Sequence, residues 1–351
     1  MICFAFVFAV VFSLAIPEEV HGARKKVIEW GWDEPDPSFI KANIRHMELL
    51  PFDGLVFHVI SKDGANLSWE TWGRKRFEVD DFRHAIEDLR STDFDKFREL
   101  FLRVNVTPGD IDWFDEEGFG TVLHNFGVAA RIAKEGGCRG FMFDVEQYQG
   151  QPFDYGKQAR AKEIPFERYA SKVRERGRQW IREVNKYFTD ITILLTFGYE
   201  IAGFREGKSR ADSPYGLLAD FLDGILEACS PKTRIVNAWE SSYPYKTKKE
   251  FRDALYTIKF TSLKWTSVPD RYRKHVRAGF GIWMDCDWRR VGWNTDDFRK
   301  NYFTPEEFEE AVRYALKASD QYVWIYTEQP RWWTRERLPE AYINALAKAR
   351  K

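Results

Sequence analysis

One stretch decides the fold of this chain: Gly140-Phe141-Met142-Phe143-Asp144-Val145-Glu146-Gln147-Tyr148. Side chains alternate between the two faces of a strand, so Phe141, Phe143 and Val145 share one face, and Met142, Asp144 and Glu146 share the other. Apolar residues on both faces indicate a parallel strand that is covered on both sides. Two acids at its C-terminal tip are costly unless the tip opens into a site. We therefore interpret the chain as built to present Asp144 and Glu146.

The first 22 residues have the pattern of a signal peptide. An uncharged run from Cys3 to Ile16 is too short to cross a bilayer, and Val20-His21-Gly22 offers a cleavage point before Ala23. No Lys or Arg precedes this run, and a buried N-terminal helix is the alternative interpretation. We expect residues 1–22 to be removed, and residues 23–351 to form one exported catalytic domain, secreted or periplasmic, without a membrane span.

The composition argues against some classes of partner and framework. Lys and Arg (54) balance Asp and Glu (54) and are interleaved with them, unlike the charges of a nucleic-acid-binding surface. Three cysteines remain after the leader, and an odd, sparse set argues against a disulfide framework, although one bridge among Cys138, Cys229 and Cys286 stays open. Aromatic residues make up 17% of the chain, with 14 Trp. Many of these Trp lie beside predicted strand ends, where a carbohydrate site would need them.

Short strands alternate with helices along the whole chain. Strands are expected at 26–32, 55–60, 100–106, 140–148, 191–197, 234–239, 279–284 and 322–327. Helices are expected at 39–50, 82–89, 121–134, 165–187, 215–229, 248–264, 304–318 and 338–351. Eight strand–helix units in succession predict an α/β fold, a single-domain (β/α)8 TIM barrel. The alternative is a doubly wound open sheet, but no glycine-rich dinucleotide fingerprint follows the first strand.

Carboxylates end five consecutive predicted strands, from the fourth to the eighth. The active site of a (β/α)8 barrel lies at these C-terminal ends. The candidate catalytic residues are Glu146, Asp144, Glu240, Asp285 and Glu328. The phase of the sixth strand is ambiguous, because Asn237 and Trp239 compete with Glu240 for the inward face.

Aromatic and polar residues near the same strand ends are candidate substrate-binding residues. They are Trp30, Trp32, His58, Asn105, Tyr148, Glu200, Trp239, Trp283, Trp324, Tyr326 and Trp332. We interpret His58 as an interior residue or a hydroxyl-binding group in preference to a metal ligand.

Paired carboxylates with aromatic walls fit glycoside hydrolysis. One acid must hold a proton for the leaving oxygen, and the other must be ionised, to act as nucleophile or to activate water. Crowding several carboxylates raises the pKa of one of them. A purely structural alternative also exists for each group. Asp144 and Glu146 would then form salt bridges with Arg103 or a loop Arg, and Glu240, Asp285 and Glu328 would only bind substrate or support the site.

The segment from Arg139 to Glu146 resembles a reduced form of the fourth-strand signature of the family 18 chitinases, Asp-Gly-x-Asp-x-Asp-x-Glu. Gly140, Asp144 and Glu146 match this signature, whereas Arg139 and Met142 stand where it has Asp. The resemblance implies a (β/α)8 glycoside hydrolase in which Glu146 is the general acid and Asp144 orients the N-acetyl group of the substrate. It covers one short motif and the architecture, and we match no characterised family over the full length.

We therefore expect a glycoside hydrolase that acts on a polysaccharide or oligosaccharide. Glu146 is the expected proton donor, Asp144 its pKa-setting neighbour or the second carboxylate, and Glu240 the first choice for the partner across the cleft. No cofactor or catalytic metal is expected, because the first strand lacks a His-x-His pair, although a structural Ca²⁺ stays open. The alternatives are a catalytically inactive glycan-binding barrel and a metal-dependent hydrolase on the same fold.

Overall fold

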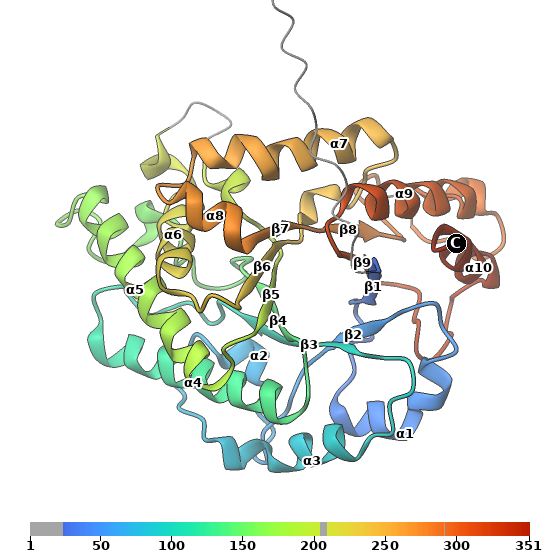
Figure 1. The fold of residues 1–351 in the computed structure, drawn as a ribbon, viewed down its shortest axis with the longest axis horizontal. Coiled ribbons are helices and arrows are strands. Elements are labelled where there is room, and N and C mark those ends of the chain that lie inside the picture. Colours follow the sequence, from blue (N-terminus) through green and yellow to red (C-terminus); the bar gives the residue numbers. More distant parts are fainter. Residues whose placement is uncertain (1–23, 204–208, 291) are drawn as a thin grey trace, which may run out of the picture.

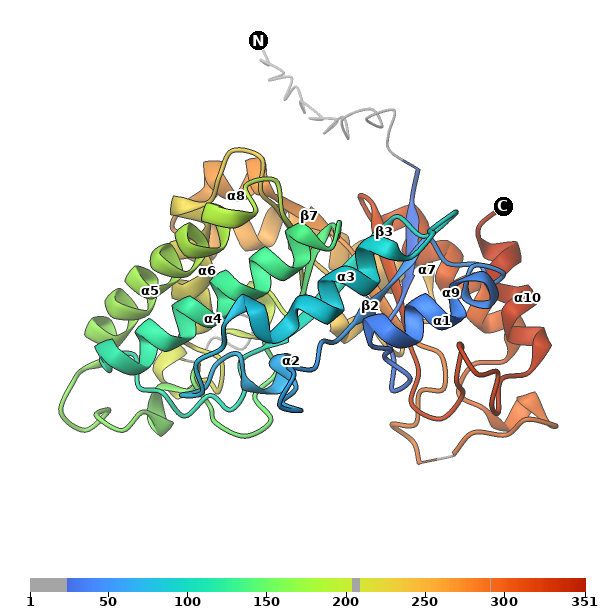
Figure 2. The same cartoon turned by 90° about the horizontal axis from the view of Figure 1, so that it is seen from below.

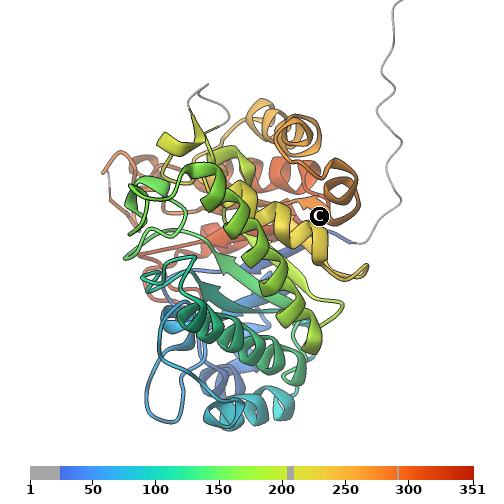
Figure 3. The same cartoon turned by 90° about the vertical axis from the view of Figure 1, so that its left-hand side faces the viewer.

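The computed structural model describes residues 24–203, 209–290 and 292–351. The predicted signal peptide lies outside these ranges. Strands occupy the centre of the molecule and helices surround them, as Figure 1 and the turned view of Figure 3 show. In the described ranges, no helix is both long enough and apolar enough to cross a membrane.

The strands form one parallel sheet, in the order β7-β6-β5-β4-β3-β2-β1-β9-β8. They are β1 (Lys26–Glu29), β2 (Gly54–Phe57), β3 (Glu99–Asn105), β4 (Gly140–Asp144), β5 (Thr192–Leu195), β6 (Arg234–Asn237), β7 (Val276–Ala278), β8 (Phe280–Trp283) and β9 (Tyr322–Tyr326). Only Gly279 separates β7, which pairs with β6, from β8, which pairs with β9. Strand β8 corresponds to the predicted seventh strand, whereas β7 was not predicted, and together they nearly close the sheet. The predicted TIM-barrel class is therefore confirmed.

Helices surround the strands (Figure 1). They are α1 (Pro37–Met47), α2 (Leu67–Glu70), α3 (Arg83–Ser91), α4 (Glu116–Glu135), α5 (Phe166–Tyr187), α6 (Leu218–Ala228), α7 (Lys248–Tyr256), α8 (Pro269–His275), α9 (Pro305–Ala318) and α10 (Glu340–Ala349). The start of α9 combines Pro at its first position with a capping box between Thr304 and Glu307.

Several helical regions differ from the expected ones. Helix α4 begins at Glu116, before the expected start at 121, because the Asp115 side chain accepts a hydrogen bond from the Gly118 N–H at 2.9 Å and caps the helix there. The helix expected over 248–264 is α7 followed by a π-helical turn at Thr257–Thr261 and a 3₁₀ turn at Ser262–Lys264. Helix α8 was not expected; it has Pro269 at its first turn.

The sheet separates two apolar cores. The core inside the barrel contains Ile28, Trp30, Val56, Phe101, Met142, Leu194, Val236, Ala238, Tyr243, Tyr322 and Trp324. The larger core contains Phe141, Phe143 and Val145, which confirms the alternation predicted for this stretch. Strand β4 begins at Gly140, where an added Cβ would lie 1.8 Å from the carbonyl oxygen of Thr192 on β5. Glycine is therefore required for the close pairing of β4 and β5.

Long loops follow several strands at their C-terminal ends. In Figure 2 the loops after β2, β4 and β8 extend together along the lower edge of the molecule. This edge is where a (β/α)8 barrel carries its functional site.

Candidate active site

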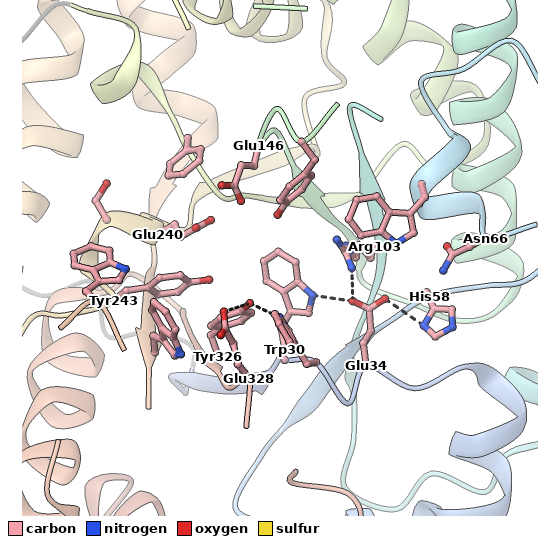
Figure 4. Close-up of a pocket in the computed structure, with 18 residues that line it drawn as sticks. Trp30, Glu34, His58, Asn66, Arg103, Glu146, Glu240, Tyr243, Tyr326 and Glu328 are labelled. Carbon is pink, nitrogen blue, oxygen red and sulfur yellow. Dashed lines mark hydrogen bonds and ion pairs between the residues drawn. The ribbon is translucent and has the colours of Figure 1, made fainter. Parts of the chain in front are cut away.

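A pocket of about 870 Å³ opens at the C-terminal ends of the strands. This volume lies in the range of small-ligand sites. Many of the candidate residues line the pocket (Figure 4): Glu146, Glu240, Glu328, Trp30, Trp32, His58, Tyr148, Trp283 and Tyr326.

Glu146 and Glu240 come from two different strand ends and point toward the middle of this pocket (Figure 4). Glu146 follows β4, and Glu240 follows β6. The ambiguity at β6 is resolved by Trp239, whose backbone is left-handed with φ of 39°. Its indole is fully buried in the outer core, and Nε1 donates to the hydroxyl of Tyr245 at 3.3 Å. Because Trp239 turns outward, Glu240 faces the pocket.

Asp144 lies beneath Glu146 and is fully buried. Its carboxylate accepts hydrogen bonds from the Glu146 N–H and from the Tyr148 hydroxyl, each at 3.0 Å. The Arg103 guanidinium is 3.6 Å away. Burial raises the pKa of Asp144 to about 6, against the opposing effect of Arg103. Asp144 therefore fixes the backbone that carries Glu146 and does not itself line the pocket.

Glu240 has the electrostatic environment of a carboxyl group that keeps its proton. Burial raises its pKa well above 4.5, and the nearby charges of Asp144 and Glu146 raise it further. No cation contributes to this shift. A carboxyl group with a raised pKa that faces a second carboxyl group is the arrangement that general acid catalysis needs.

Glu34 organises the opposite side of the pocket, and it was not among the residues proposed from the sequence. Its carboxylate accepts from Trp30 Nε1 at 2.8 Å and from Arg103 Nη1 at 3.3 Å, and it lies 3.3 Å from His58 Nδ1. Burial opposes its ionisation, but Arg103 and His58 outweigh this effect and its pKa is lowered. Glu34 therefore holds two cation-forming side chains at one end of the pocket (Figure 4).

Aromatic rings form the walls. The Arg103 guanidinium lies between two indoles, 5.6 Å from the ring centre of Trp30 and 4.6 Å from that of Trp69. Trp69 in turn contacts Tyr148, with ring centres 5.3 Å apart. At the mouth, the exposed Trp32 is fixed by a hydrogen bond of 2.7 Å from its Nε1 to the Tyr326 hydroxyl.

The last two candidate carboxylates have different surroundings. Glu328 lines the pocket and accepts from the Tyr326 hydroxyl at 3.2 Å. Asp285 is buried behind it and accepts from the backbone N–H groups of Glu328 and Gln329, the latter at 2.8 Å. Asp285 therefore holds the loop after β9 and does not reach the pocket.

Five candidate substrate-binding residues also do not line the pocket. Asn105 and Glu200 are buried, and the amide of Asn237 donates to Glu200 at 2.9 Å. Trp324 fills the barrel interior, where its Nε1 donates to the Ala238 carbonyl at 2.8 Å. Trp239 and Trp332 belong to the outer core. The dense packing of a barrel interior explains why tryptophans close to a strand end are covered by neighbouring side chains.

Several lining residues were missed by sequence reasoning. They are Glu34, Asn66, Trp69, Arg103, Phe197, Ser241, Tyr243 and Trp288. Trp69 lies in the long loop after β2, and Glu34 lies in the turn after β1. A signal existed for the loop tryptophan, because a large aromatic residue in a polar loop is unusual, but nothing local marks Glu34.

Cys138, Cys229 and Cys286 are buried and free. Within residues 24–203, 209–290 and 292–351, no three His, Cys, Asp or Glu side chains are grouped so as to hold a metal ion.

No family model and no curated protein matches this chain. Solved structures do match. A psychrophilic glycoside hydrolase family 10 endo-β-1,4-xylanase has a TM-score of 0.50 at 12% identity, with 92% of this chain and 96% of that chain covered. A trimodular GH5_4 endoglucanase also has a TM-score of 0.50, at 13% identity, with 93% of this chain aligned to 60% of that one.

A putative sugar phosphate isomerase/epimerase from Anabaena variabilis matches with a TM-score of 0.46 at 11% identity, over 92% of this chain and 88% of that chain. At these identities the two matches with a TM-score of 0.50 show the barrel fold, and they assign no catalytic residue.

Proposed function

We propose that this protein is a glycoside hydrolase in which Glu146 and Glu240 act on one glycosidic bond. The observation that carries the proposal is the pair itself. Two carboxyl groups from separate strand ends face one aromatic-walled pocket, at the barrel face where catalytic groups lie (Figure 4). Glycosidases place two carboxyl groups on opposite sides of the scissile bond.

The surroundings of the two groups support different roles. Glu240, with its raised pKa, donates a proton to the glycosidic oxygen as the bond to the anomeric carbon breaks. Glu146 then acts as the ionised partner, either attacking that carbon or taking a proton from the water that does so. This assignment exchanges the roles expected from the sequence, where Glu146 was the proton donor. Asp144 positions Glu146 through its backbone.

The charges of the pocket favour a neutral or amino sugar as substrate. The lining includes the carboxyl groups of Glu34, Glu146, Glu240 and Glu328. Arg103 lines the pocket too, but it is paired with Glu34. A uronic acid or sulfated sugar would meet repulsion here and no cation that is free of a carboxylate. We propose a polysaccharide or oligosaccharide substrate for an exported, secreted or periplasmic protein whose residues 23–351 form the catalytic domain.

The first experiment is reducing-end release from a panel of neutral, amino and acidic polysaccharides. The proteins compared are the wild type, Glu146→Gln, Glu240→Gln and the control Glu163→Gln, in which the exposed Glu163 lies outside the pocket. Loss of a general acid or base typically costs about 10²–10⁴-fold. Such a loss in both pocket variants, with the control unchanged, supports the proposal.

Two other outcomes would overturn it. Release that survives both substitutions would exclude Glu146 and Glu240 from the chemistry. Retained glycan binding, without release from any polymer, would identify a catalytically inactive barrel.

A further inference from the structure

A second cavity, of about 680 Å³, opens at the opposite end of the barrel. Its lining includes the first residues of strands, among them Glu99 of β3, Thr192 of β5, Arg234 of β6 and Tyr322 of β9. It shares no residue with the pocket that contains Glu146 and Glu240.

The lining of this cavity is strongly basic. Its cations are Lys134, Arg139, Lys232, Arg234, Lys274 and Arg277. Its carboxylates are Glu99 and Asp190, and both are already engaged. Asp190 pairs with Lys134 at 2.8 Å, and Glu99 pairs with Arg139 at 3.4 Å and accepts from the Tyr322 hydroxyl at 2.8 Å.

Four of the cations have no acidic partner. In the part of the chain that the structure describes, no carboxylate lies within ion-pair distance of Lys232, Arg234, Lys274 or Arg277. Lys232, Arg234 and Lys274 are exposed to solvent. The guanidinium of Arg277 donates to the Val276 carbonyl at 2.9 Å, which holds it at the rim. Like charges gathered in one cavity repel each other, and an anion between them would relieve that repulsion.

We propose that this cavity binds an oxyanion, a phosphate or sulfate group that is either free or carried as an ester on a small molecule. Guanidinium groups pair with such oxyanions through two parallel hydrogen bonds, and ammonium groups add charge without a fixed direction. The cations enclose a cavity and are not spread along an extended stripe, which favours a small ligand over a nucleic acid chain.

The test is isothermal titration calorimetry with inorganic phosphate, inorganic pyrophosphate and glucose 6-phosphate, at low ionic strength. The variant Arg234→Ala/Lys274→Ala removes two cavity cations. The matched control Lys162→Ala/Arg168→Ala removes two exposed cations that lie outside the cavity, so both variants have the same net charge.

We expect the association constant to fall at least tenfold in the cavity variant and to stay within twofold in the control. Pyrophosphate should bind more tightly than phosphate, and added salt should weaken both. Tighter binding of glucose 6-phosphate than of inorganic phosphate would identify an ester as the ligand, and the reverse would identify the free ion.

A thermal melt gives an independent readout, because a ligand that binds only the folded state raises Tm. Phosphate should raise the Tm of the wild type and the control more than that of the cavity variant. Absence of binding by all three anions, or equal losses in the two double variants, would overturn the proposal. Release of reducing ends should be the same in both variants, which separates this test from that of the hydrolase.

Discussion

The Asp144 carboxylate accepts a hydrogen bond of 3.0 Å from the backbone N–H of Glu146. Asp144 is fully buried at the end of β4, whereas Glu146 lines the pocket. The first acid of the motif thus holds the chain that presents the second. The resemblance to the chitinase signature implied a direct role for this Asp in orienting the substrate, and we instead propose a positioning role.

The raised pKa of Asp144 predicts how stability depends on pH. A carboxyl group whose pKa rises from 3.8 to about 6 on folding contributes stability below pH 3.8, which is lost as pH rises through about 6. Asp144→Asn removes this dependence. Between pH 3.5 and pH 7.5, the free energy of unfolding of the wild type should therefore fall by about 3 kcal/mol relative to that of the variant. Urea denaturation of both proteins across this range measures the difference, and a constant difference would show that folding does not raise the pKa of Asp144.

Glu34→Gln should destabilise the protein. The substitution leaves Arg103 without the charge that it faces at 3.3 Å. Removing one partner of a buried ion pair costs about 3 kcal/mol. Ionisation of Glu34 stabilises the fold above pH 4.5, and this stabilisation is lost as pH falls. The difference in stability between the wild type and the variant should therefore be smaller in acid. Thermal melts at pH 7 and pH 3.5 test this, with Glu163→Gln as the control. An equal difference in Tm between the wild type and Glu34→Gln at the two pH values would contradict the prediction.

Trp32→Ala should weaken substrate binding and leave stability unchanged. The side chain is 64% exposed at the mouth of the pocket, where Tyr326 fixes its ring plane. Loss of one stacked aromatic platform costs ~1.4 kcal/mol, a tenfold rise in KM, with kcat little changed. Tyr256→Ala is the control, because Tyr256 is 61% exposed and outside the pocket. If both substitutions have the same effect on KM, Trp32 is not a sugar platform.

Two helical glycines should respond in opposite ways to alanine. At Gly177 in α5, an added Cβ would lie 2.2 Å from the Phe221 carbonyl oxygen of α6, so Gly177→Ala should force the two helices apart and destabilise by about 1–3 kcal/mol. At Gly120 in α4, an added Cβ meets open space, and Gly120→Ala should stabilise by about 0.5–1 kcal/mol. Chemical denaturation measures both, and equal shifts would contradict the close packing of α5 on α6.

The sequence predicted those features that depend on local alternation. The buried strand at 140–144 follows the two-residue period, so the inward placement of Met142 and Asp144 could be predicted. The seventh strand was predicted at 279–284, which corresponds to β8 alone. The additional strand β7 before Gly279 depends on pairing with β6, which is distant in the sequence, and could not be predicted from local alternation.

The pocket was less predictable, because burial near a strand end depends on neighbouring strands. Trp32 is exposed and Trp324 is enclosed in the barrel, although both lie beside strand ends. Glu240 faces inward only because Trp239 adopts a left-handed backbone, and that conformation is uncommon for a bulky residue. Besides the nearby Trp30, Glu34 has partners from β3 and from the chain after β2, so its role depends on tertiary contacts.

The most direct test of the central claim compares two leaving groups on the sugar that the polysaccharide panel identifies. A natural glycoside needs a proton on its departing oxygen, whereas a dinitrophenyl glycoside does not. We predict that Glu240→Gln loses at least a hundredfold in kcat/KM on the natural glycoside and less than tenfold on the dinitrophenyl glycoside, while Glu146→Gln loses heavily on both. The reverse pattern, with Glu146→Gln spared on the dinitrophenyl glycoside, would contradict the assignment of Glu240 as the proton donor.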